Sequence, residues 1–428
     1  MSPSTLPDWL SRLEAAHPRQ IELGLDRVRV VARRLGLERA GVPVYTVGGT
    51  NGKGSCVAVI DGLLGASGIR TGCYTSPHLR RYNERVRIAG VEATDEALCH
   101  AFAAVEAARG EVSLTYFEHG TLAAFQLFRE ARVERLVLEV GLGGRLDAVN
   151  LLDADVAVVT SIGLDHQEWL GPDRESIGRE KAGIFRAGRP AVVGDSEPPA
   201  SLHEVARALG AHWFAIGEAF DYSTLPDGRW TWRGLSPGGQ ALQAGPMAAP
   251  GLMASNVACA LQALALGGDL PAPAVLEASL PGIRVEGRMQ RLRCAGVDCL
   301  LDVAHNPAGV AALGARLAAD APRGREFVVM GAMRDKDFAG MIAALAPQVD
   351  RWFFADLPLE RAAAASELAA AVPGDAARSC FAGLSGALGA ALAAAAPGDR
   401  VLVCGSFHVV GPALSWFEAH ADAIGEGM

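Results

Sequence analysis

The sequence lacks the features of a secreted, membrane-spanning or zinc-binding protein. Its eight cysteines are scattered, mostly inside apolar runs, and none forms a C-x-x-C pair that would indicate a zinc or redox site. No stretch reaches the roughly 18 to 20 apolar residues that spanning a bilayer requires. The N-terminal residues contain charges and prolines in place of the apolar core of a signal peptide. We therefore expect a cytoplasmic protein whose cysteines are reduced core residues.

An excess of positive charge is also missing. Asp and Glu number 48 against 39 Lys and Arg, which gives a formal net charge of -9. This balance speaks against a nucleic-acid partner or an anionic membrane surface, although a local basic pocket can still hold a small anionic ligand. We expect small-molecule partners.

At 428 residues, half of them apolar, the chain is long enough for two domains with sizeable cores. Short apolar segments alternate with longer helical patterns, which predicts an α/β fold with parallel sheets covered on both faces. The expected strands of a first domain are 45–49, 69–76, 135–141, 156–163 and 190–195. Those of a second domain are 298–305, 326–333, 351–356 and 400–406.

The stretch SLPGIRVEGRMQRL (279–292), which has no sustained period, separates the two series of strands. Its proline and glycines are typical of a connection between domains. We interpret it as a hinge region and divide the chain into a larger domain, 1–286, and a smaller domain, 287–428.

The segment VYTVGGTNGKGS joins an expected strand to a helical pattern that begins at Ser55. In that context the N–H groups at a helix start can hold phosphate oxygens, Lys53 can neutralise phosphate charge and Ser55 can offer its hydroxyl to Mg²⁺. The match to G-x-x-x-x-G-K-[ST] is imperfect, because only three residues separate Gly48 from Gly52 and Gly54 stands between the lysine and the serine. The alternative is a glycine turn whose lysine is solvated.

Polar residues also follow other expected strands, where open α/β sheets bind their ligands. Glu139 lies in the apolar strand LVLEVG, so its charge is costly unless a cation such as Mg²⁺ or hydrogen-bond donors compensate it. Ser76 ends another strand. It is either a metal contact or a plain strand-terminating or helix-capping serine. His166 follows VAVVTSIGLD. It is either a metal-site residue or a surface or capping histidine.

Six motifs together resemble the folylpolyglutamate synthase/dihydrofolate synthase family, in the same order along the chain. They are GTNGKGS, TSPHLRRYNERVRI, LEVGLGGRLDAVN, TSIGLDHQEWLGPDRESIGREKAGIFR, LDVAHNP and GSFHVVG. The wider relatives are the ATP-dependent Mur ligases, whose additional N-terminal domain we do not expect here. The resemblance implies a P-loop-type parallel-sheet ATPase domain of the Mur ligase type, followed by a smaller Rossmann-like α/β domain.

The resemblance also implies nucleotide and metal sites. The loop that would hold the ATP phosphates comprises Gly49, Thr50, Asn51, Gly52, Lys53, Gly54 and Ser55. One Mg²⁺ would be held by Ser55, Ser76 and Glu139, and a second by Glu139 and His166. Lys181, in KAGIFR, would be carbamylated by CO₂ and act as a carboxylate-like metal ligand. Carbamate formation needs a neutral amine, which burial beside divalent cations favours. The sequence alone favours a solvated helix lysine.

Further contacts to ATP follow from the same resemblance. They are Asn256 in the first domain and Arg288, Asp302 and His305 in the second, and Asn306 would shape the turn beside His305. Helix capping is the alternative for Asn256. A capped strand-to-helix turn is the alternative for Asp302 and Asn306.

The two remaining substrates are assigned in the same way. Phe117 would stack on the pterin ring, with simple core packing as its alternative, while Asp147 and Ala148 would hydrogen-bond to the amino-pyrimidinone edge. Ser406 and His408, in GSFHVVG, would bind the incoming glutamate, although His408 could equally be a satisfied polar residue at a strand end. Phe117 and Asp147 together favour an enzyme that also accepts dihydropteroate.

The expected reaction is ATP-dependent amide formation by a monomer, with Lys53, Glu139, His166 and Lys181 as catalytic residues. A substrate carboxylate attacks the γ-phosphate to give an acyl phosphate, and the amine of L-glutamate then displaces phosphate. The acceptors would be dihydropteroate and the glutamate tail of tetrahydrofolate. Two alternatives stay open, namely a Mur-type ligase for another carboxylate substrate and an ATP-binding module without ligase chemistry.

Overall fold

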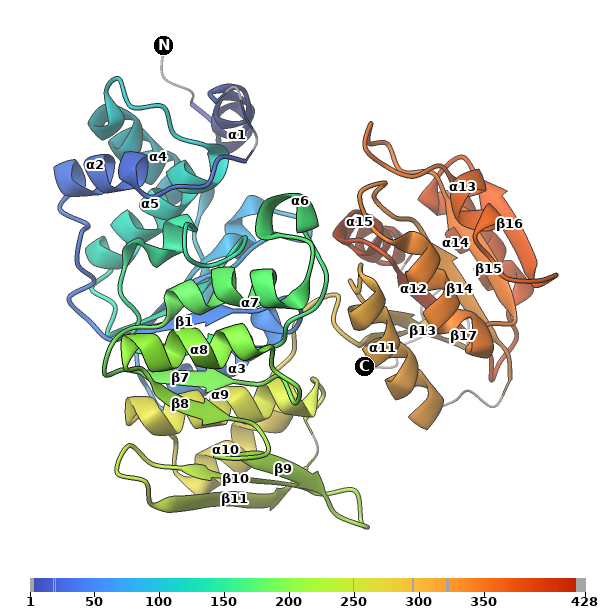
Figure 1. Cartoon of the computed structure of the whole chain (residues 1–428). Helices are drawn as coiled ribbons and strands as arrows, with labels where there is room; N and C mark the ends of the chain where they lie inside the picture. The colour runs from blue at the N-terminus through green and yellow to red at the C-terminus, as the bar shows by residue number, and fades with distance from the viewer. Residues whose placement is uncertain are drawn as a thin grey trace. The chain divides into compact units, whose positions relative to one another are not determined.

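The structure, a computed structural model, describes residues 4–17, 19, 21–248, 250–294, 296–320 and 324–420. The chain divides into two compact units, Met1–Ile283 and Arg284–Met428, each with its own main sheet (Figure 1). The last residues of the expected second domain, 421–428, lie outside the described residues. Within the described ranges, no helix is long and apolar enough to cross a membrane.

An eight-stranded, mainly parallel sheet forms the centre of the first unit, with the order β4-β3-β2-β5-β1-β6-β7-β8. The pairings β2–β3 and β3–β4 are antiparallel, and the other pairings are parallel. The five predicted strands are confirmed, and every residue of β1, β2 and β6 is buried, because helices cover both faces. The strands are β1 (Val44–Gly48), β2 (Thr71–Tyr74), β3 (Val86–Ile88), β4 (Val91–Glu92), β5 (Arg135–Glu139), β6 (Val156–Val159), β7 (Pro190–Val193) and β8 (His212–Ala215).

Helices surround this sheet (Figure 1). α3 packs against β1, β5 and α9, whereas α5 packs against β2 and α4. The helices are α1 (Leu6–Ala15), α2 (Asp26–Leu35), α3 (Lys53–Ala66), α4 (Asp95–Arg109), α5 (Tyr116–Glu130), α6 (Gln167–Leu170), α7 (Arg174–Lys181), α8 (Ala200–Leu209), α9 (Ala254–Gly267) and α10 (Pro273–Ser279).

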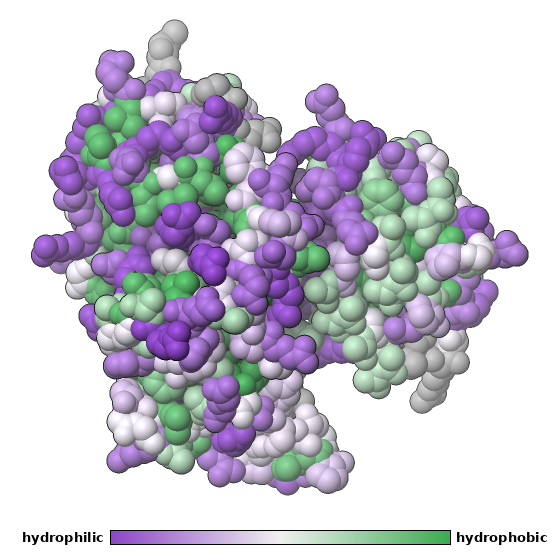
Figure 2. All heavy atoms as spheres, viewed as in Figure 1, coloured by the Kyte–Doolittle hydropathy of each residue, from purple (hydrophilic) through white to green (hydrophobic). Residues whose placement is uncertain are grey.

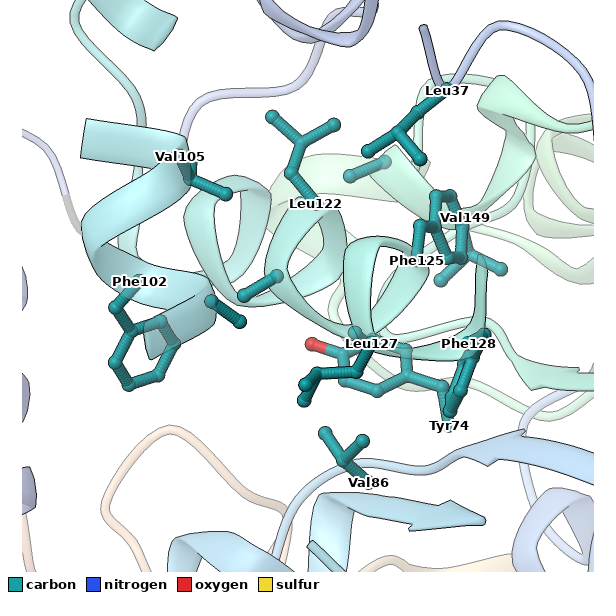
Figure 3. Close-up of a cluster of buried hydrophobic side chains, with 14 of the residues drawn as sticks. Leu37, Tyr74, Val86, Phe102, Val105, Leu122, Phe125, Leu127, Phe128 and Val149 are labelled. Atoms are coloured by element: carbon teal, nitrogen blue, oxygen red, sulfur yellow. The ribbon is translucent and has the colours of Figure 1, made fainter. Parts of the chain in front are cut away.

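A hydrophobic core joins α4 and α5 to β2 and β5 (Figure 3). Phe102, Leu122 and Phe128 in this core are at most 1% exposed, and burying each such side chain stabilises the fold by about 1.5–3 kcal/mol. The N-terminus of α5 is fixed as well, because Thr115 caps it and forms a reciprocal capping box with Glu118. The first turn of α5 is therefore held at both its cap and its buried face.

The strand-helix alternation did not predict a three-stranded antiparallel sheet in the first unit. It has the order β11-β10-β9 and comprises β9 (Asp221–Thr224), β10 (Trp230–Leu235) and β11 (Ala241–Met247). Burial alternates along β10, where Trp230 and Trp232 are each 1% exposed and the residues between and after them are less buried. Such half-buried strands lack the continuous apolar runs that identified the parallel strands.

The second unit contains a six-stranded sheet with the order β12-β13-β17-β14-β15-β16. The four predicted strands are confirmed as parallel neighbours, whereas β12, which is antiparallel, and β16 were not predicted. The strands are β12 (Gln290–Cys294), β13 (Val297–Leu301), β14 (Glu326–Met330), β15 (Arg351–Ala355), β16 (Ala377–Phe381) and β17 (Arg400–Cys404). The helices are α11 (Pro307–Ala319), α12 (Phe338–Leu345), α13 (Ala365–Ala370), α14 (Leu384–Ala394) and α15 (Phe407–Ala419).

The face of the molecule seen in Figure 2 carries hydrophilic side chains with small apolar areas between them. Single exposed apolar side chains are normal on protein surfaces. Among the described residues, the large exposed ones are Val30, Val91, Leu164, Trp169, Leu209, Tyr222 and Leu359.

Two glycine-to-alanine changes are expected to alter stability in opposite directions. At Gly72, in β2, an added Cβ would lie 2.6 Å from Phe128 Cγ and 3.1 Å from Leu136 Cδ2. Gly72→Ala should therefore lower the free energy of unfolding by about 1–3 kcal/mol through overpacking. At the exposed Gly65 of α3, an added Cβ meets no described atom within 4 Å beyond its own helix and chain neighbours. Gly65→Ala should raise the free energy of unfolding by about 0.5–1 kcal/mol.

Urea unfolding followed by circular dichroism measures both variants. A Gly72→Ala protein as stable as the wild type would contradict the close packing of β2 against α5.

Candidate active site

The glycine loop connects β1 to α3 at the carboxyl end of β1. Gly49 (φ +133°) and Gly52 (φ +90°) have backbone conformations that favour glycine. An added Cβ would lie 2.0 Å from Thr160 Oγ1 at Gly49 and 2.3 Å from Asn256 Oδ1 at Gly52. No side chain among the described residues caps α3, which begins at Lys53. The first N–H groups of this helix can therefore bind an anion such as phosphate.

Residues that follow β6 hold this loop in place, and they were not among the predicted site residues. Thr160 Oγ1 and Ser161 Oγ both donate to the carbonyl oxygen of Asn51, over 2.6 and 3.1 Å. Thr50 N donates to Ser161 O over 2.7 Å, and Gly163 N donates to Thr50 Oγ1 over 3.0 Å. Two hydroxyl residues directly after a buried strand were a signal for this role, because such side chains commonly bond to nearby backbone.

Lys53 and Lys181 both contact the carbonyl oxygen of Gly49. Lys53 Nζ donates to Gly49 O and to Thr50 O, each over 3.1 Å. Lys181 Nζ, at the end of α7, donates to Gly49 O over 2.9 Å. Burial, and then the charge of Lys53, lower the pKa of Lys181 to about 7. Lys181 is therefore a buried amine that can lose its proton near neutral pH. The alternative of a solvated helix lysine, which the sequence alone favours, is wrong.

Lysine itself is scarce in this chain. The only lysines are Lys53, Lys181 and Lys336, and the other basic residues counted with them are arginines. Two of the three thus lie in one cluster. Because arginine stays protonated in proteins whereas a buried lysine shifts its pKa readily, this scarcity was a sequence signal that could have marked Lys181.

Glu139, the last residue of β5, lies beside the loop. The parallel register places it next to Val47 of β1. Its side chain is buried, its Oε2 accepts a hydrogen bond from Ser76 N over 3.2 Å, and both of its oxygens would lie 3.8 Å from a Cβ on Gly54. Ser55, in the first turn of α3, is buried as well. A buried carboxylate beside the glycine loop suits Mg²⁺, which binds few protein oxygens and keeps water and phosphate ligands.

His166 lies on the loop between β6 and α6, with φ +52°, and its side chain does not cap α6. Its Nε2 lies 3.9 Å from Asp165 Oδ1, and the charge of Asp165 opposes the lowering of the Lys181 pKa by burial. The described residues contain no group of three or more His, Cys, Asp and Glu side chains that could hold a metal. A metal here would therefore need hydroxyl, phosphate or carbamate oxygens besides Glu139 and His166.

Asp147, just beyond β5, is 3% exposed. Its carboxylate oxygens accept hydrogen bonds from Leu142 N and Val149 N, over 2.8 and 2.9 Å. Burial raises the pKa of Asp147 to about 6, while these backbone bonds and the charge of Lys53 partly offset the rise. The carboxylate is thus oriented by the protein and electrostatically linked to the glycine loop.

Phe117, in the first turn of α5, is only partly buried. Its ring packs over Gly141, where an added Cβ would lie 2.7 Å from Phe117 Cζ, and its centroid lies 5.9 Å from that of Tyr74. Ala148, which is buried, follows Asp147 at the start of the 3₁₀ helix η2 (Ala148–Leu151). Phe117 therefore sits at the edge of the core, where part of its surface stays accessible.

Asn256 is buried in α9, and its side chain packs against Gly52 of the loop. Met253, and not Asn256, occupies the N-terminal capping position of α9. The helix-capping alternative for Asn256 is therefore wrong.

In the second unit, the predicted nucleotide contacts lie near the start of β12 and after β13. The guanidinium carbon of Arg288 lies 5.6 Å from the centroid of the Phe407 ring, and the His305 ring lies 5.7 Å from the same centroid. Asp302 accepts two backbone N–H hydrogen bonds, each over 2.9 Å. Phe407 was not a predicted site residue, yet it brings Arg288 and His305 together.

Two other predicted residues of this unit begin helices. Asn306 Oδ1 accepts from Gly309 N over 2.8 Å at the start of α11, which confirms its capped-turn alternative. Ser406 Oγ accepts from His408 N over 3.1 Å at the start of α15. Partial burial, and then the charge of Arg361, lower the pKa of His408.

A pocket of about 280 Å³ lies elsewhere in the first unit. Its lining includes Val42, Phe125, Arg132 and Leu136, so it is near the amino ends of β1 and β5. The candidate site lies at the carboxyl ends of the same strands and is separate from this pocket.

Two family models match the chain. They are the Mur ligase middle domain, over residues 47–202, and the Mur ligase glutamate ligase domain, over residues 287–407. The chain is 44% identical to the dihydrofolate synthase/folylpolyglutamate synthase of Escherichia coli, over 97% of this chain and 96% of that protein. It is 37% identical to the protein of the same name from Haemophilus influenzae, over 95% and 96% of the two chains.

Solved structures are similar as well. The E. coli FolC complex with DHPP and ADP has a TM-score of 0.93 at 43% identity, over 98% of this chain and 99% of that chain. The bifunctional enzyme of Yersinia pestis complexed with AMPPNP and Mn ion has a TM-score of 0.91 at 43% identity, over 98% and 99%.

Replacing Lys181 is expected to change how stability depends on pH. The pKa of Lys181 is near 7 in the folded protein against an ordinary 10.5, so between these values the unfolded chain holds a proton that the folded protein does not. The wild type should therefore gain stability with rising pH, relative to Lys181→Met, by up to about 1.4 kcal/mol per pH unit.

Urea unfolding at pH 7 and pH 9, in CO₂-free buffer without nucleotide or divalent cations, measures this difference. A constant difference between the two proteins would show that Lys181 keeps an ordinary pKa.

Proposed function

The chain belongs to the folylpolyglutamate synthase/dihydrofolate synthase family of Mur-type ligases, and on that premise we propose how its residues bind ATP and form an amide bond. It is an ATP-dependent carbon–nitrogen ligase that joins L-glutamate to dihydropteroate and to the glutamate tail of tetrahydrofolate. One observation carries the assignment of residues, which is that Lys53 and Lys181 meet at Gly49 O on the glycine loop at the start of α3.

The glycine loop binds the ATP phosphates. Its N–H groups at the start of α3 donate hydrogen bonds to the negative oxygens, and Lys53 neutralises their charge. The Asn256 side chain, from α9, packs on Gly52 of this loop. Because Lys53 bonds to two carbonyl oxygens of the loop, its ammonium is already positioned before the nucleotide binds.

Divalent metal is held on the strand ends beside the loop. Ser55, Ser76 and Glu139 would hold one Mg²⁺, and Glu139 and His166 a second. Bound Mg²⁺ neutralises phosphate charge and orients the γ-phosphate for attack. Carbamylation joins the neutral Nζ of Lys181 to the carbon of CO₂ with loss of one proton and gives an anion. Counted from the ammonium form, two protons are lost and a cation is replaced by an anion. The burial of this amine and its lowered pKa support that modification.

We place the folate substrate at residues of α5 and of the segment that follows β5. Phe117 stacks on the pterin ring, and the Asp147 carboxyl group and Ala148 bond to its amino-pyrimidinone edge. With a pKa near 6, Asp147 is mainly a carboxylate at neutral pH and accepts hydrogen bonds from ring N–H groups.

The second domain, 287–428, completes the reaction. Arg288, Asp302 and His305 would contact the nucleotide, and Ser406 with His408 would bind L-glutamate. We assign the ATP and folate sites to the first domain, 1–286, and take the active enzyme to be a monomer.

The reaction proceeds in two steps. An oxygen of the substrate carboxylate attacks the γ-phosphorus, the bond to ADP breaks, and an acyl phosphate forms. The neutral α-amine of glutamate then attacks the acyl carbon, phosphate leaves with the bonding electrons, and the amine loses its proton. Lys53 stabilises the charge that develops on the phosphate oxygens during the first step.

Glutamate-dependent phosphate release from Mg-ATP tests this function. We expect release with dihydropteroate and with tetrahydrofolate as separate substrates. Lys53→Ala should lower kcat about 10²–10³-fold with both, because one preorganised charge is lost, while the folded state is kept. Arg33→Ala, which removes a positive charge from the exposed face of α2, is the matched control and should retain full activity.

Several results would contradict the assignment. Retained turnover and unchanged ATP affinity in Lys53→Ala would exclude the role given to this lysine. Silence of the folded wild type with both folates would point to another carboxylate substrate, or to an ATP-binding module if no substrate of the Mur type is turned over.

Carbamylation of Lys181 can be observed directly. After incubation with ¹³C-bicarbonate and Mg²⁺, the wild type should give one carbamate carbon signal by NMR that Lys181→Met lacks. Activity should also fall in CO₂-free buffer and return with bicarbonate. A wild type without this signal, fully active in CO₂-free buffer, would contradict the proposal.

A further inference from the structure

Arg85, the last residue of the 3₁₀ helix η1 (Tyr82–Arg85), is held rigidly at the start of β3. Its guanidinium carbon lies 5.4 Å from the ring centroid of Tyr82 and 5.7 Å from that of Tyr116. Its Nε donates to His78 Nδ1 over 2.8 Å. Two aromatic faces and one hydrogen bond to a neutral acceptor therefore position a cation without neutralising it.

Four other arginines with buried or partly buried side chains have a carboxylate partner. Arg27, Arg109, Arg135 and Arg400 each form an ion pair within 3.0 Å. Arg85 is also partly buried, yet among the described residues it forms no ion pair with a carboxylate, and its polar neighbours are His78 and Tyr74. A planar fork of donors held in this way is suited to a carboxylate supplied by a ligand.

The position of Arg85 links the two halves of the proposed folate site. Its carbonyl oxygen accepts from Thr75 N over 2.9 Å, and the next residue, Ser76, bonds to Glu139 on the metal side. On the pterin side, Tyr74 lies between Arg85 and Phe117. The Tyr74 ring is 5.9 Å from that of Phe117, and its hydroxyl is buried next to Arg85. Burial raises the pKa of Tyr74, and the nearby charge of Arg85 opposes this rise.

The two folate substrates differ in charge close to the reacting group. Dihydropteroate ends in a single carboxylate, which is the one activated by ATP. In a folate, the γ-carboxylate of the glutamate tail reacts, and the α-carboxylate of the same residue stays charged. Such a group is costly to remove from water unless a cation meets it.

We propose that Arg85 binds this α-carboxylate through its terminal guanidinium nitrogens and thereby determines specificity for the folylpolyglutamate synthase reaction. The inference rests on the proposed function, because it requires both substrates to use one site. It assigns Arg85 to a substrate group that dihydropteroate does not have.

The test is the Arg85→Gln variant of the full-length enzyme, assayed with each substrate by glutamate-dependent phosphate release. We expect the KM for monoglutamyl tetrahydrofolate to rise about 10- to 100-fold, the range for losing a charged hydrogen bond. The KM for dihydropteroate and both kcat values should stay within about twofold of the wild type. Unchanged dihydropteroate activity also shows that the variant is folded. Arg85→Lys, which keeps the charge but loses the fork, should restore only part of the tetrahydrofolate affinity.

Arg81→Gln is the matched control, because it removes the same charge from an exposed ion pair with Asp95 in the same segment. It should leave both KM values unchanged. An unchanged tetrahydrofolate KM in Arg85→Gln, or an equal rise for both substrates, would overturn the inference while the ligase function stands. If Arg85→Gln does not fold, the same comparison is made with Arg85→Lys. A KM for tetrahydrofolate equal to that of the wild type in this variant would overturn the inference. A wild type inactive with both substrates would overturn the proposed function and this inference together.

Discussion

The carbonyl oxygen of Gly49 accepts hydrogen bonds from both Lys53 and Lys181, and the rest of the site depends on this shared contact. Two ammonium groups on one acceptor repel each other, and burial adds to that cost. The chain meets the cost by letting one of them, Lys181, lose its proton easily. The other, Lys53, stays on the phosphate loop. One backbone atom of the glycine loop thus contacts both Lys53, which we propose binds phosphate, and Lys181, whose pKa is lowered.

This contact requires a loop of unusual shape, and the parallel sheet provides it. Gly49 comes within van der Waals distance of Thr160, and Gly52 comes equally close to Asn256, so a side chain at either position would clash. The hydroxyl groups after β6 fix the loop from one side, and Glu139 at the end of β5 lies on the other. Since the strands are parallel, their carboxyl ends meet at one edge, and the charges from β1, β5 and β6 gather there.

The strand β5 and the helix α5 together connect the glycine loop to the residues that we propose bind the folate. Glu139 ends β5, and the chain continues directly to Gly141, on which Phe117 of α5 packs, and to Asp147. Arg85 and Tyr74 lie along the same path from the neighbouring strands. A hydrophobic core and a capping box fix α5, so ordinary packing holds Phe117 at a constant distance from the end of β5.

The sequence by itself determined the two α/β domains, the parallel strands and the loop around Lys53, because continuous apolar runs and a glycine-rich turn before a helix are local patterns. Its motifs were also specific enough to indicate the family. It did not indicate the antiparallel strands β9–β11, the contacts of Thr160 and Ser161, or the burial of Lys181. Each of these depends on residues far apart in the chain. Two hydroxyl residues after a strand, or a lysine in a chain with few lysines, can mark a candidate, but neither pattern identifies the atoms that the side chain contacts. Only the tertiary structure, by burying Lys181 against Gly49 and stacking Arg85 on two tyrosines without a carboxylate, decided which of these side chains are chemically unusual.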